Sequence, residues 1–285
     1  NFLRIDTKDN LGVVGDYTVT TFHNNVLTLD DSQDGHLGTA ATLGSLHAIT
    51  SDSSGNLYVV EDHKVRKISP EGVVSTIAGT ATAGDTLGPT NQATFNSPYG
   101  VAVDSSGNLY VANNGNHTIR KIDINVSGGW VSDLAGRSGY PGNVDGYAEG
   151  HAQFDQPWGV AVDSTGNVFV ADYGNGSIRK IGLSEELGQV GETVVTTVAS
   201  GLSSPRGLTL DSSGNLYVVE ASVYGGGNQV KKIDTDGNVT TIAGTGTYGS
   251  TDGAATTEAE FDNPLGVTVD SKGNVFVEDL ANHMM

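Results

Sequence analysis

One short pattern recurs five times along the chain and limits the folds that the chain can adopt. A Gly-Asn pair is followed by an aliphatic residue, an aromatic residue and valine. The pattern begins at Gly55, Gly107, Gly166, Gly214 and Gly273. Each interval is 48 to 59 residues long, which is enough for about four strands of five or six residues with their connections. A period of this size indicates a repeat architecture built from identical supersecondary units.

Each unit reads as four antiparallel strands. In the second unit, GVAVD at 100–104 places its valines on one face, which is the period-two pattern of a half-buried strand. The turn SSGN at 105–108 predicts a tight hairpin in which Gly107 adopts a positive φ. The second, third and fourth strands are expected at 109–113, 118–123 and 130–136. No segment has sustained helical spacing, so we expect an all-β protein with under about a tenth of its residues helical. Repeated four-stranded sheets with long connections predict the blades of a β-propeller.

The second and third units also resemble a known family. Their common pattern, P-x-G-V-A-V-D-x-x-G-N-x-(Y/F)-V-A-(N/D) followed by N-x-x-I-R-K-I, is similar to that of the NHL-repeat β-propellers. In the second unit the matching residues are Pro98, Gly100, Asp104, Gly107, Asn108, Tyr110, Asn116, Ile119, Arg120 and Ile122. In the third unit they are Pro157, Gly159, Asp163, Gly166, Asn167, Phe169, Asp172, Asn175, Ile178 and Arg179. The resemblance covers almost the whole chain and implies the fold, but this fold supports enzymes, sensors and interaction modules alike.

The strand count leaves the number of blades open. Residues 1–285 are expected to form a single propeller of five visible blades that begins and ends in mid-blade. The segments 2–6 and 17–22 read as a third and a fourth strand, and they could complete the blade begun at 266–280, which would close a ring of five. The resemblance implies six blades, and ANHMM at 281–285 is similar to the start of a third strand. The alternative is therefore that the sequence is a fragment of a longer array.

Charge and composition narrow the choice of partners. The chain has 33 acidic and 14 basic residues, a formal net charge of −19, and no cysteine. Such a surface repels phosphate backbones and anionic membranes, so we expect neither a nucleic-acid partner nor membrane insertion. No apolar run approaches the ~20 residues that span a bilayer. The scarcity of lysine and the abundance of Gly, Ser, Thr, Asn and Asp favour a secreted or cell-surface protein, with a soluble intracellular protein as the alternative.

Function is expected where the repeat varies. The residue eight positions before each anchor glycine differs from unit to unit, and the five residues at this position are His47, Tyr99, Trp158, Arg206 and Leu265. The first strand of a blade lines the central channel, so these residues should surround its mouth. Aromatic walls with a few polar groups are typical of a site for a small ligand, a peptide or a protein. The alternative is an assorted set of side chains that binds nothing specific.

Metal chemistry receives less support. Three histidines occupy one repeat position before the third strand, and they are His63, His117 and His283. Because the three histidines lie at the same position on different blades, we expect each to form a local hydrogen bond, and we do not expect them to converge on a zinc ion. The resemblance extends to peptidyl-amidoglycolate lyases, which surround a central zinc with several histidines and use a catalytic tyrosine and arginine. Here the mouth offers Tyr99 and Arg206 with a single histidine, His47, whereas a catalytic zinc usually has three protein ligands.

Acidic residues leave a weak calcium site as an open alternative. Three glutamates follow second strands, namely Glu61, Glu220 and Glu278. Three Asp-Gly pairs, at 34–35, 145–146 and 252–253, each precede an apolar residue by eight positions, counted from the glycine. These apolar residues are Leu43, Phe154 and Phe261. We interpret each Asp-Gly segment as a turn followed by a plug that packs between blades, with a cation-binding loop as the alternative.

Together these features favour a non-enzymatic binding or interaction module that recognises a ligand or protein at the channel mouth, with no resident cofactor. The second interpretation is a hydrolase or lyase that uses the same mouth. The third is a structural subunit of a surface assembly, in which self-assembly would replace ligand binding.

Overall fold

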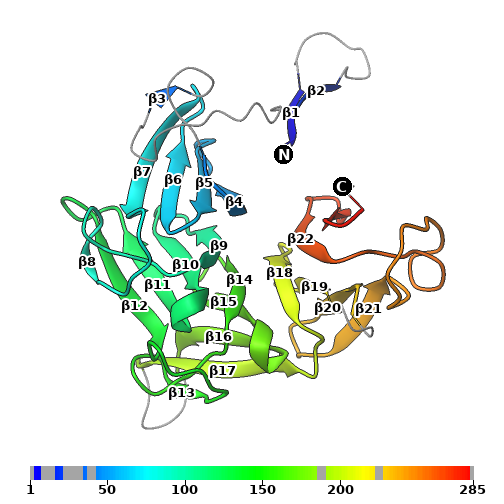
Figure 1. Ribbon diagram of the computed structural model, residues 1–285. Helices are drawn as coiled ribbons and strands as arrows, with labels where there is room; N and C mark the ends of the chain where they lie inside the picture. Colours follow the sequence, from blue (N-terminus) through cyan, green and yellow to red (C-terminus); the bar gives the residue numbers. More distant parts are fainter. Residues whose placement is uncertain are drawn as a thin grey trace.

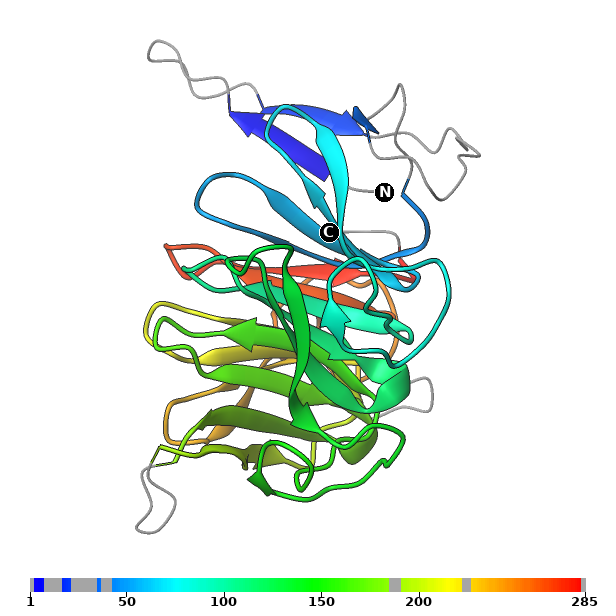
Figure 2. The ribbon, with the colours of Figure 1, turned by 90° about the vertical axis from the view of Figure 1, so that its left-hand side faces the viewer.

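The computed structural model describes residues 3–7, 17–21, 35–36, 43–184, 191–221 and 227–282. Within these residues the regular structure consists of β-strands and two three-residue 3₁₀ helices, η1 (Asn114–Asn116) and η2 (Tyr173–Asn175). The prediction of an all-β protein is therefore confirmed. Figures 1 and 2 show the strands gathered into separate sheets that are arranged radially.

Three sheets have the same five-stranded order, with a short outermost strand that arrives from the preceding loop. The first blade contains β4 (Leu46–Ser51), β5 (Leu57–Glu61), β6 (Lys64–Ile68), β7 (Val73–Gly79) and the outer β3 (Gly35–His36). The second contains β9 (Pro98–Val103), β10 (Leu109–Asn113), β11 (Thr118–Asp123), β12 (Trp130–Gly136) and the outer β8 (Gly88–Pro89). The third contains β14 (Pro157–Val162), β15 (Val168–Asp172), β16 (Ser177–Leu183), β17 (Thr193–Ser200) and the outer β13 (Gly146–Tyr147).

The remaining sheets are smaller. The fourth blade contains β18 (Pro205–Leu210), β19 (Leu216–Glu220), β20 (Gln229–Ile233) and β21 (Val239–Ala243). A two-stranded sheet of β22 (Pro264–Val269) and β23 (Val275–Asp279) follows it. Near the N-terminus, β1 (Leu3–Thr7) and β2 (Tyr17–Thr21) pair with each other, as the sequence predicts, in a ladder separate from that of β22 and β23. Closure of a five-bladed ring by the termini stays a prediction.

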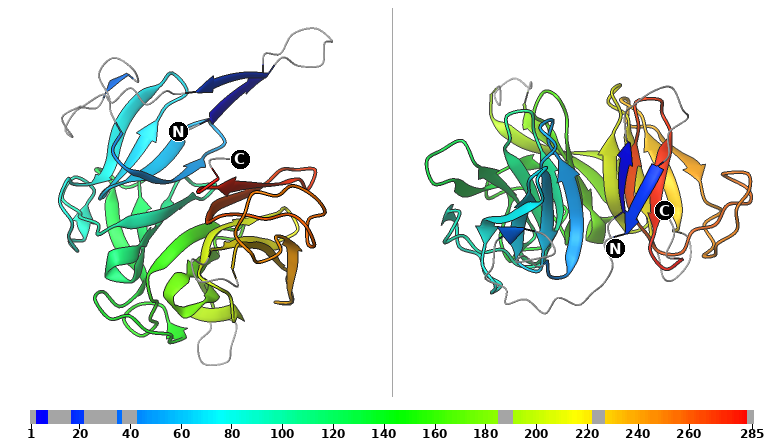
Figure 3. Two further views of the ribbon diagram at one scale, coloured as in Figure 1. Left: turned by 45° about the vertical axis from the view of Figure 1, so that its right-hand side comes forward. Right: turned by 90° about the horizontal axis from the view of Figure 1, so that it is seen from above.

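The innermost strands follow one another around a central channel. β4 packs against β9, β9 against β14, β14 against β18, and β18 against β22. Figure 3 shows this succession from two further sides. A glycine at the same position of β9, β14 and β18 allows the close approach, because a Cβ on Gly100, Gly159 or Gly207 would lie under 3.0 Å from a backbone oxygen of the next blade. Only glycine lets two backbones pass at this separation.

The Asp-x-x-Gly-Asn turn forms the same hydrogen-bonded unit in successive blades. In the second blade, Asp104 Oδ1 accepts the backbone N–H groups of Ser106 and Asn108, each at 2.9 Å. Its Oδ2 accepts the Asn108 side-chain amide at 2.8 Å and the Tyr110 hydroxyl at 3.1 Å. Gly107 has a φ of 86°, and the anchor glycines of the other units are also positive. The predicted hairpin conformation is confirmed, and the aspartate explains why the turn repeats as a unit.

Apolar side chains from neighbouring blades form shared cores. Phe154 is fully buried in one cluster with Tyr110 of the second blade and Val168 of the third. Phe95 is buried likewise between the first and second blades. The predicted plug is confirmed for Phe154. Leu43 packs against the core of the first blade, and Phe261 is half-buried.

Candidate binding site at the channel mouth

The five predicted mouth residues occupy equivalent backbone positions. Each is the second residue of its first strand, and each lies where the pairing of the first strand with the second shifts register. Such a β-bulge bends the strand and redirects a side chain. At this position the side chain therefore departs from the regular alternation of directions along the strand. Sequence spacing does not reveal this register shift.

Four of these side chains form a continuous row across four blades. The ring centroids of His47 and Tyr99 are 4.6 Å apart, and those of Tyr99 and Trp158 are 4.1 Å apart with only 24° between their planes. The guanidinium carbon of Arg206 lies 4.9 Å from the centre of the Trp158 ring, within the range of a cation–π contact. Tyr173 extends the row with a centroid distance of 5.3 Å to Trp158. All five predicted residues are half-buried.

Two residues that support the row were not predicted. Tyr173 comes from η2, and the centre of its ring lies 5.9 Å from the Arg206 guanidinium carbon. Asn263 precedes β22, and its Oδ1 accepts a hydrogen bond from Arg206 Nη1 at 2.8 Å. The Arg206 Nε atom is buried and has no acceptor within the part of the chain that the structure describes. The sequence carries no signal for these contacts, since they join residues from different blades.

Beside the row lies a pocket of about 470 Å³. His47, Tyr99, Trp158 and Leu265 contribute to its lining, and Phe276, Glu278 and Leu280 come from the region of β23. Gly207 of the fourth blade, the residue after Arg206, also lines this pocket. The volume fits a small molecule or a peptide side chain, and the lining combines apolar surface with a few polar groups, as in most ligand pockets.

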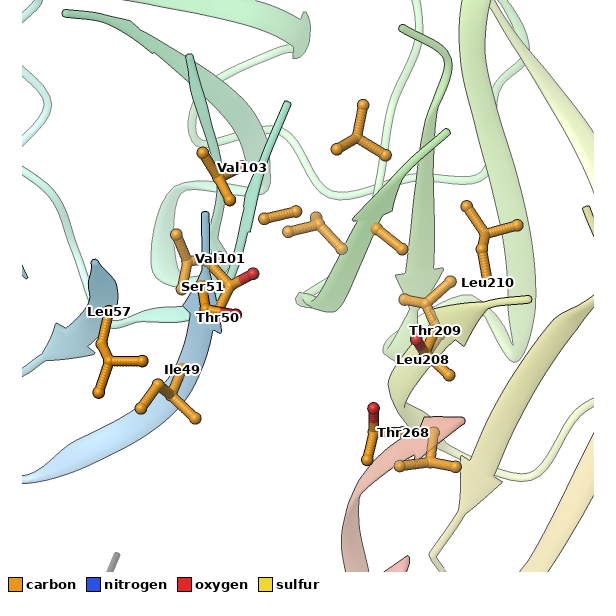
Figure 4. A pocket seen from close by; sticks show the side chains of 15 residues that line it. Ile49, Thr50, Ser51, Leu57, Val101, Val103, Leu208, Thr209, Leu210 and Thr268 are labelled. Carbon is orange, nitrogen blue, oxygen red and sulfur yellow. The ribbon is translucent and has the colours of Figure 1, made fainter. Parts of the chain in front are cut away.

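A second cavity of about 480 Å³ continues along the channel. Val101, Val160, Leu208 and Val267 line both spaces, so the two form successive parts of one channel. Figure 4 shows Thr50, Thr209 and Thr268 among its labelled side chains, together with aliphatic residues of the first strands. The inner part therefore offers hydroxyl groups in an otherwise aliphatic wall.

Two ionisable groups of the mouth have shifted pKa values. Burial lowers the pKa of His47, although the Asp62 carboxylate partly opposes this effect, so the imidazole is mainly neutral near pH 7. Burial raises the pKa of Glu278. In the earlier units its place in the second strand is occupied by Val60, Ala112, Ala171 and Val219. The carboxylate of the last unit therefore stands at a position that is otherwise apolar.

The three glutamates that we grouped as calcium candidates do not share one role. Glu61 pairs with Arg66 at 2.5 Å and accepts the Gly44 N–H at 2.7 Å. Glu220 accepts the Ser203 N–H at 2.9 Å. Both are the last residue of their second strand, whereas Glu278 is one position earlier. Within the described ranges no three His, Asp or Glu side chains converge as metal ligands.

The histidines before the third strands accept hydrogen bonds from the next blade. His63 Nδ1 accepts the backbone N–H of Ser97 at 3.2 Å, and His117 Nδ1 accepts that of Gln156 at 3.0 Å. Ser97 and Gln156 have positive φ values of 47° and 51°, so each histidine stabilises an unusual backbone turn. The structural role predicted for these two histidines is confirmed. His283 lies outside the described residues.

Antiparallel sheets of four or five strands, arranged radially around a channel, define a β-propeller. Residues 95–122 and 154–181 match the family model described as the NHL repeat. These matches support the predicted NHL-repeat β-propeller. In the described residues no helix is long and apolar enough to cross a membrane.

Three known proteins are similar to this chain. NHL repeat-containing protein 2 from Bos taurus is 28% identical over 270 residues, which cover 80% of this chain and 37% of the bovine protein. A probable peptidyl-alpha-hydroxyglycine alpha-amidating lyase from Caenorhabditis elegans is 31% identical over 127 residues, covering 44% of this chain and 34% of that protein. The structure of an auxiliary nutrient binding protein from Bacteroides ovatus has a TM-score of 0.55 at 15% identity and covers 89% of this chain and 71% of that one. The chain thus spans less than half of either curated relative, and the structural likeness concerns the fold alone.

Proposed function

We propose that this propeller is a binding module, secreted or on a cell surface, that recognises a small ligand, a peptide or a protein side chain at the channel mouth. The observation that carries this proposal is the row from His47 to Arg206 beside a pocket of about 470 Å³. Tryptophan, tyrosine and arginine side chains dominate the binding energy at many recognition surfaces.

The chemistry of the mouth indicates what kind of group it accepts. The aromatic edges, Leu265 and Phe276 offer an apolar wall for a ring or branched aliphatic group. Arg206 presents a cation and a buried N–H donor without an acceptor in the described residues. A ligand with an apolar body and a carboxylate or carbonyl acceptor matches both features. The high net negative charge favours small acidic groups over large polyanions.

The chain offers a convenient reporter for the test. It has two tryptophans, and Trp130 is on the fourth strand of its blade with half of its surface exposed. In a Trp130→Phe variant, Trp158 would report on the mouth alone. N-acetyl-phenylalanine is expected to change its fluorescence in a saturable way, and N-acetyl-phenylalanine amide is expected to bind more weakly. Loss of this difference in Arg206→Ala would support the site, whereas no saturable change with either probe would argue against this ligand class.

The second candidate is a hydrolase or lyase that uses the same mouth. It is supported by the similarity to the probable lyase of Caenorhabditis elegans and by the row in which His47 contacts Tyr99 and Arg206 joins through Trp158. Turnover of a peptidyl-hydroxyglycine substrate by the purified chain, lost in Tyr99→Phe, would move this candidate to first place. A structural subunit that assembles with copies of itself remains the third candidate, and light scattering at increasing concentration tests it.

A further inference from the structure

The turn before the first strand of the third blade is held by a histidine of the second blade. His117 Nδ1 accepts the backbone N–H of Gln156 at 3.0 Å. Gln156 has a φ of 51°, a left-handed conformation that is uncommon for a residue with a side chain. Trp158 of the row at the mouth is two residues further along the chain. The hydrogen bond therefore fixes the backbone from which Trp158 projects.

The same imidazole nitrogen also faces a carboxylate. Asp155 Oδ1 lies 3.4 Å from His117 Nδ1, and the two side chains are 36% and 16% exposed. A bare Nδ1 accepts the Gln156 N–H, whereas a protonated Nδ1 is a donor and pairs with the Asp155 carboxylate instead. One nitrogen cannot serve both neighbours at once, so the proton decides which of them it contacts.

The other elements around His117 bring no competing charge to the ring. η1, which precedes it, contains only asparagine and glycine. Gly136, at the end of β12, packs on the His117 backbone, and the next residue, Arg137, lies over the Tyr140 ring with its guanidinium carbon 3.9 Å from the ring centre. Among the described residues, Asp155 is the one carboxylate that pairs with His117.

Asp155 connects this exchange to a second residue of the row. Its backbone N–H donates to Asp172 Oδ1 at 2.8 Å, and its carbonyl accepts the Gly174 N–H at 2.8 Å. Tyr173 lies between these two partners in the chain and contacts Trp158. A movement of Asp155 toward the imidazole therefore displaces the supports of both Tyr173 and Trp158.

The junction between the first and second blades has the histidine without the carboxylate. His63 Nδ1 accepts the Ser97 N–H at 3.2 Å, and Ser97 has a φ of 47°. The residue before Ser97 is Asn96, whose side-chain amide donates to Asn116 Oδ1 at 3.1 Å. A proton on His63 would thus find a neutral amide where His117 has a carboxylate.

The two later junctions have no imidazole at this position. Gly176 takes the place of the histidine between the third and fourth blades. After the fourth blade, Asn228 Oδ1 accepts the Asn263 N–H at 3.3 Å, and Asn263 has a φ of 57°. An asparagine therefore makes the same hydrogen bond without a group that titrates. Within the described blades, the histidine and the carboxylate occur together only at the junction that carries Trp158.

We propose that His117 is a positioning residue that makes the row at the mouth depend on pH. The neutral imidazole holds the Gln156 turn and keeps Trp158 in contact with its neighbours. Protonation of Nδ1 removes the acceptor of the Gln156 N–H and draws the Asp155 carboxylate to the ring. The turn then loosens, because its positive φ loses the hydrogen bond that stabilises it. Histidine is the residue that changes charge between pH 5 and 8. The consequence for binding, weaker ligand capture at acidic pH, rests on the proposed function.

The first measurement uses no ligand. In Trp130→Phe, the fluorescence of Trp158 is followed from about pH 8 to about pH 5.5, a range that covers the titration of an imidazole. We expect one transition, with stronger quenching by acrylamide at acidic pH. Adding His117→Asn should remove this transition, because asparagine accepts the N–H, as Asn228 does, and carries no proton to exchange. Asp155→Asn should move the midpoint to lower pH, since it removes the charge that pairs with the imidazolium.

The matched control is His151→Asn. His151 contacts Tyr147 of the outer strand β13, so this variant should keep the transition. A transition that persists in His117→Asn, or one that is lost in His47→Asn instead, would overturn the proposal. Circular dichroism over the same range tests whether the change is local, and loss of the β-sheet signal together with the fluorescence change would also overturn it.

The second measurement adds N-acetyl-phenylalanine at both ends of the pH range, where its carboxylate stays ionised. Its affinity for Trp130→Phe should fall several-fold at acidic pH, and the fall should be smaller once His117→Asn is added. Equal affinities at the two pH values would overturn the coupling to binding. A transition that depends on His117, without binding of the probe, would support the pH-dependent row and contradict the proposed ligand class. Binding without such a transition would overturn the role of His117 and leave the proposed function standing.

Discussion

Trp158 and Tyr99 come from neighbouring blades and stack with their ring centroids 4.1 Å apart. Each residue follows a proline and precedes a glycine, so the close packing of β9 against β14 positions both rings. The two rings therefore belong both to the contact between two blades and to the wall of the pocket at the channel mouth. Mutations can separate these two roles.

The first prediction concerns Trp158. Replacing it with alanine should cost about 2 kcal/mol or more of binding free energy if it anchors a ligand. Because the side chain is only half-buried and lies outside the blade cores, the loss of folding stability should be smaller than for a core aromatic. Calorimetric titration and thermal melting measure the two effects. A large drop in melting temperature with unchanged binding would identify Trp158 as a packing residue only.

The second prediction concerns the glycine after the mouth residue. Gly159→Ala would place a Cβ under 3.0 Å from the Arg206 carbonyl, which belongs to the backbone of the next blade and cannot move aside independently. We expect a destabilisation of about 1–3 kcal/mol, measured by urea unfolding. Gly266→Ala is the matched control on β22, because the nearest atom there is the flexible Glu278 carboxylate at 3.0 Å. Equal effects of the two substitutions would contradict the close-approach explanation.

The third prediction concerns acid stability. Burial by itself would raise the pKa of Asp104, but hydrogen bonds from Asn108, Tyr110 and Ser106 lower it below the usual value. Since the folded pKa is below the unfolded one, the stabilisation is complete above the unfolded value of about 4 and is lost as the pH falls through the folded value. Urea unfolding from pH 7 to pH 3 should therefore depend less on pH in Asp104→Asn than in the wild type. An unchanged dependence would contradict the role of this turn.

The fourth prediction concerns tyrosine ionisation in the same turns. Burial and the neighbouring Asp104 carboxylate raise the pKa of Tyr110 to about 12, and burial with Asp52 does the same for Tyr58. A spectrophotometric titration should show these two phenols ionising near pH 12, above the usual tyrosine value of about 10. In Asp104→Asn the Tyr110 transition should move to lower pH, because the negative charge beside the phenolate is removed. Tyr58, in another blade, serves as the internal control.

The fifth prediction concerns metal content. Protein purified without chelator is expected to contain no stoichiometric zinc, because His47 is the one histidine among the five predicted mouth residues and a catalytic zinc usually needs three protein ligands. Elemental analysis provides the measurement. One zinc per chain that disappears in His47→Ala, together with a catalytic activity, would favour the lyase interpretation.

The blade architecture could be predicted because its signals are local. The alternation in 100–104, the Asp104 turn and the positive φ of Gly107 depend on residues close together in sequence. The repeat then gives every unit the same shape, so residues at one offset must occupy equivalent places, and this predicted that His47, Tyr99 and Trp158 lie side by side. The channel pocket could be located on this basis.

Relationships between blades could not be predicted, because no local pattern records them. The stacking angle of Tyr99 on Trp158, the support of Arg206 by Asn263 and the position of Glu278 in the pocket depend on how one sheet packs on the next. The sequence alone thus determined the strands, their turns and the ring of variable positions, since these follow from two-residue periodicity and short-range hydrogen bonds. The tertiary structure decided which side chains meet, because those contacts join residues about 35 to 60 positions apart.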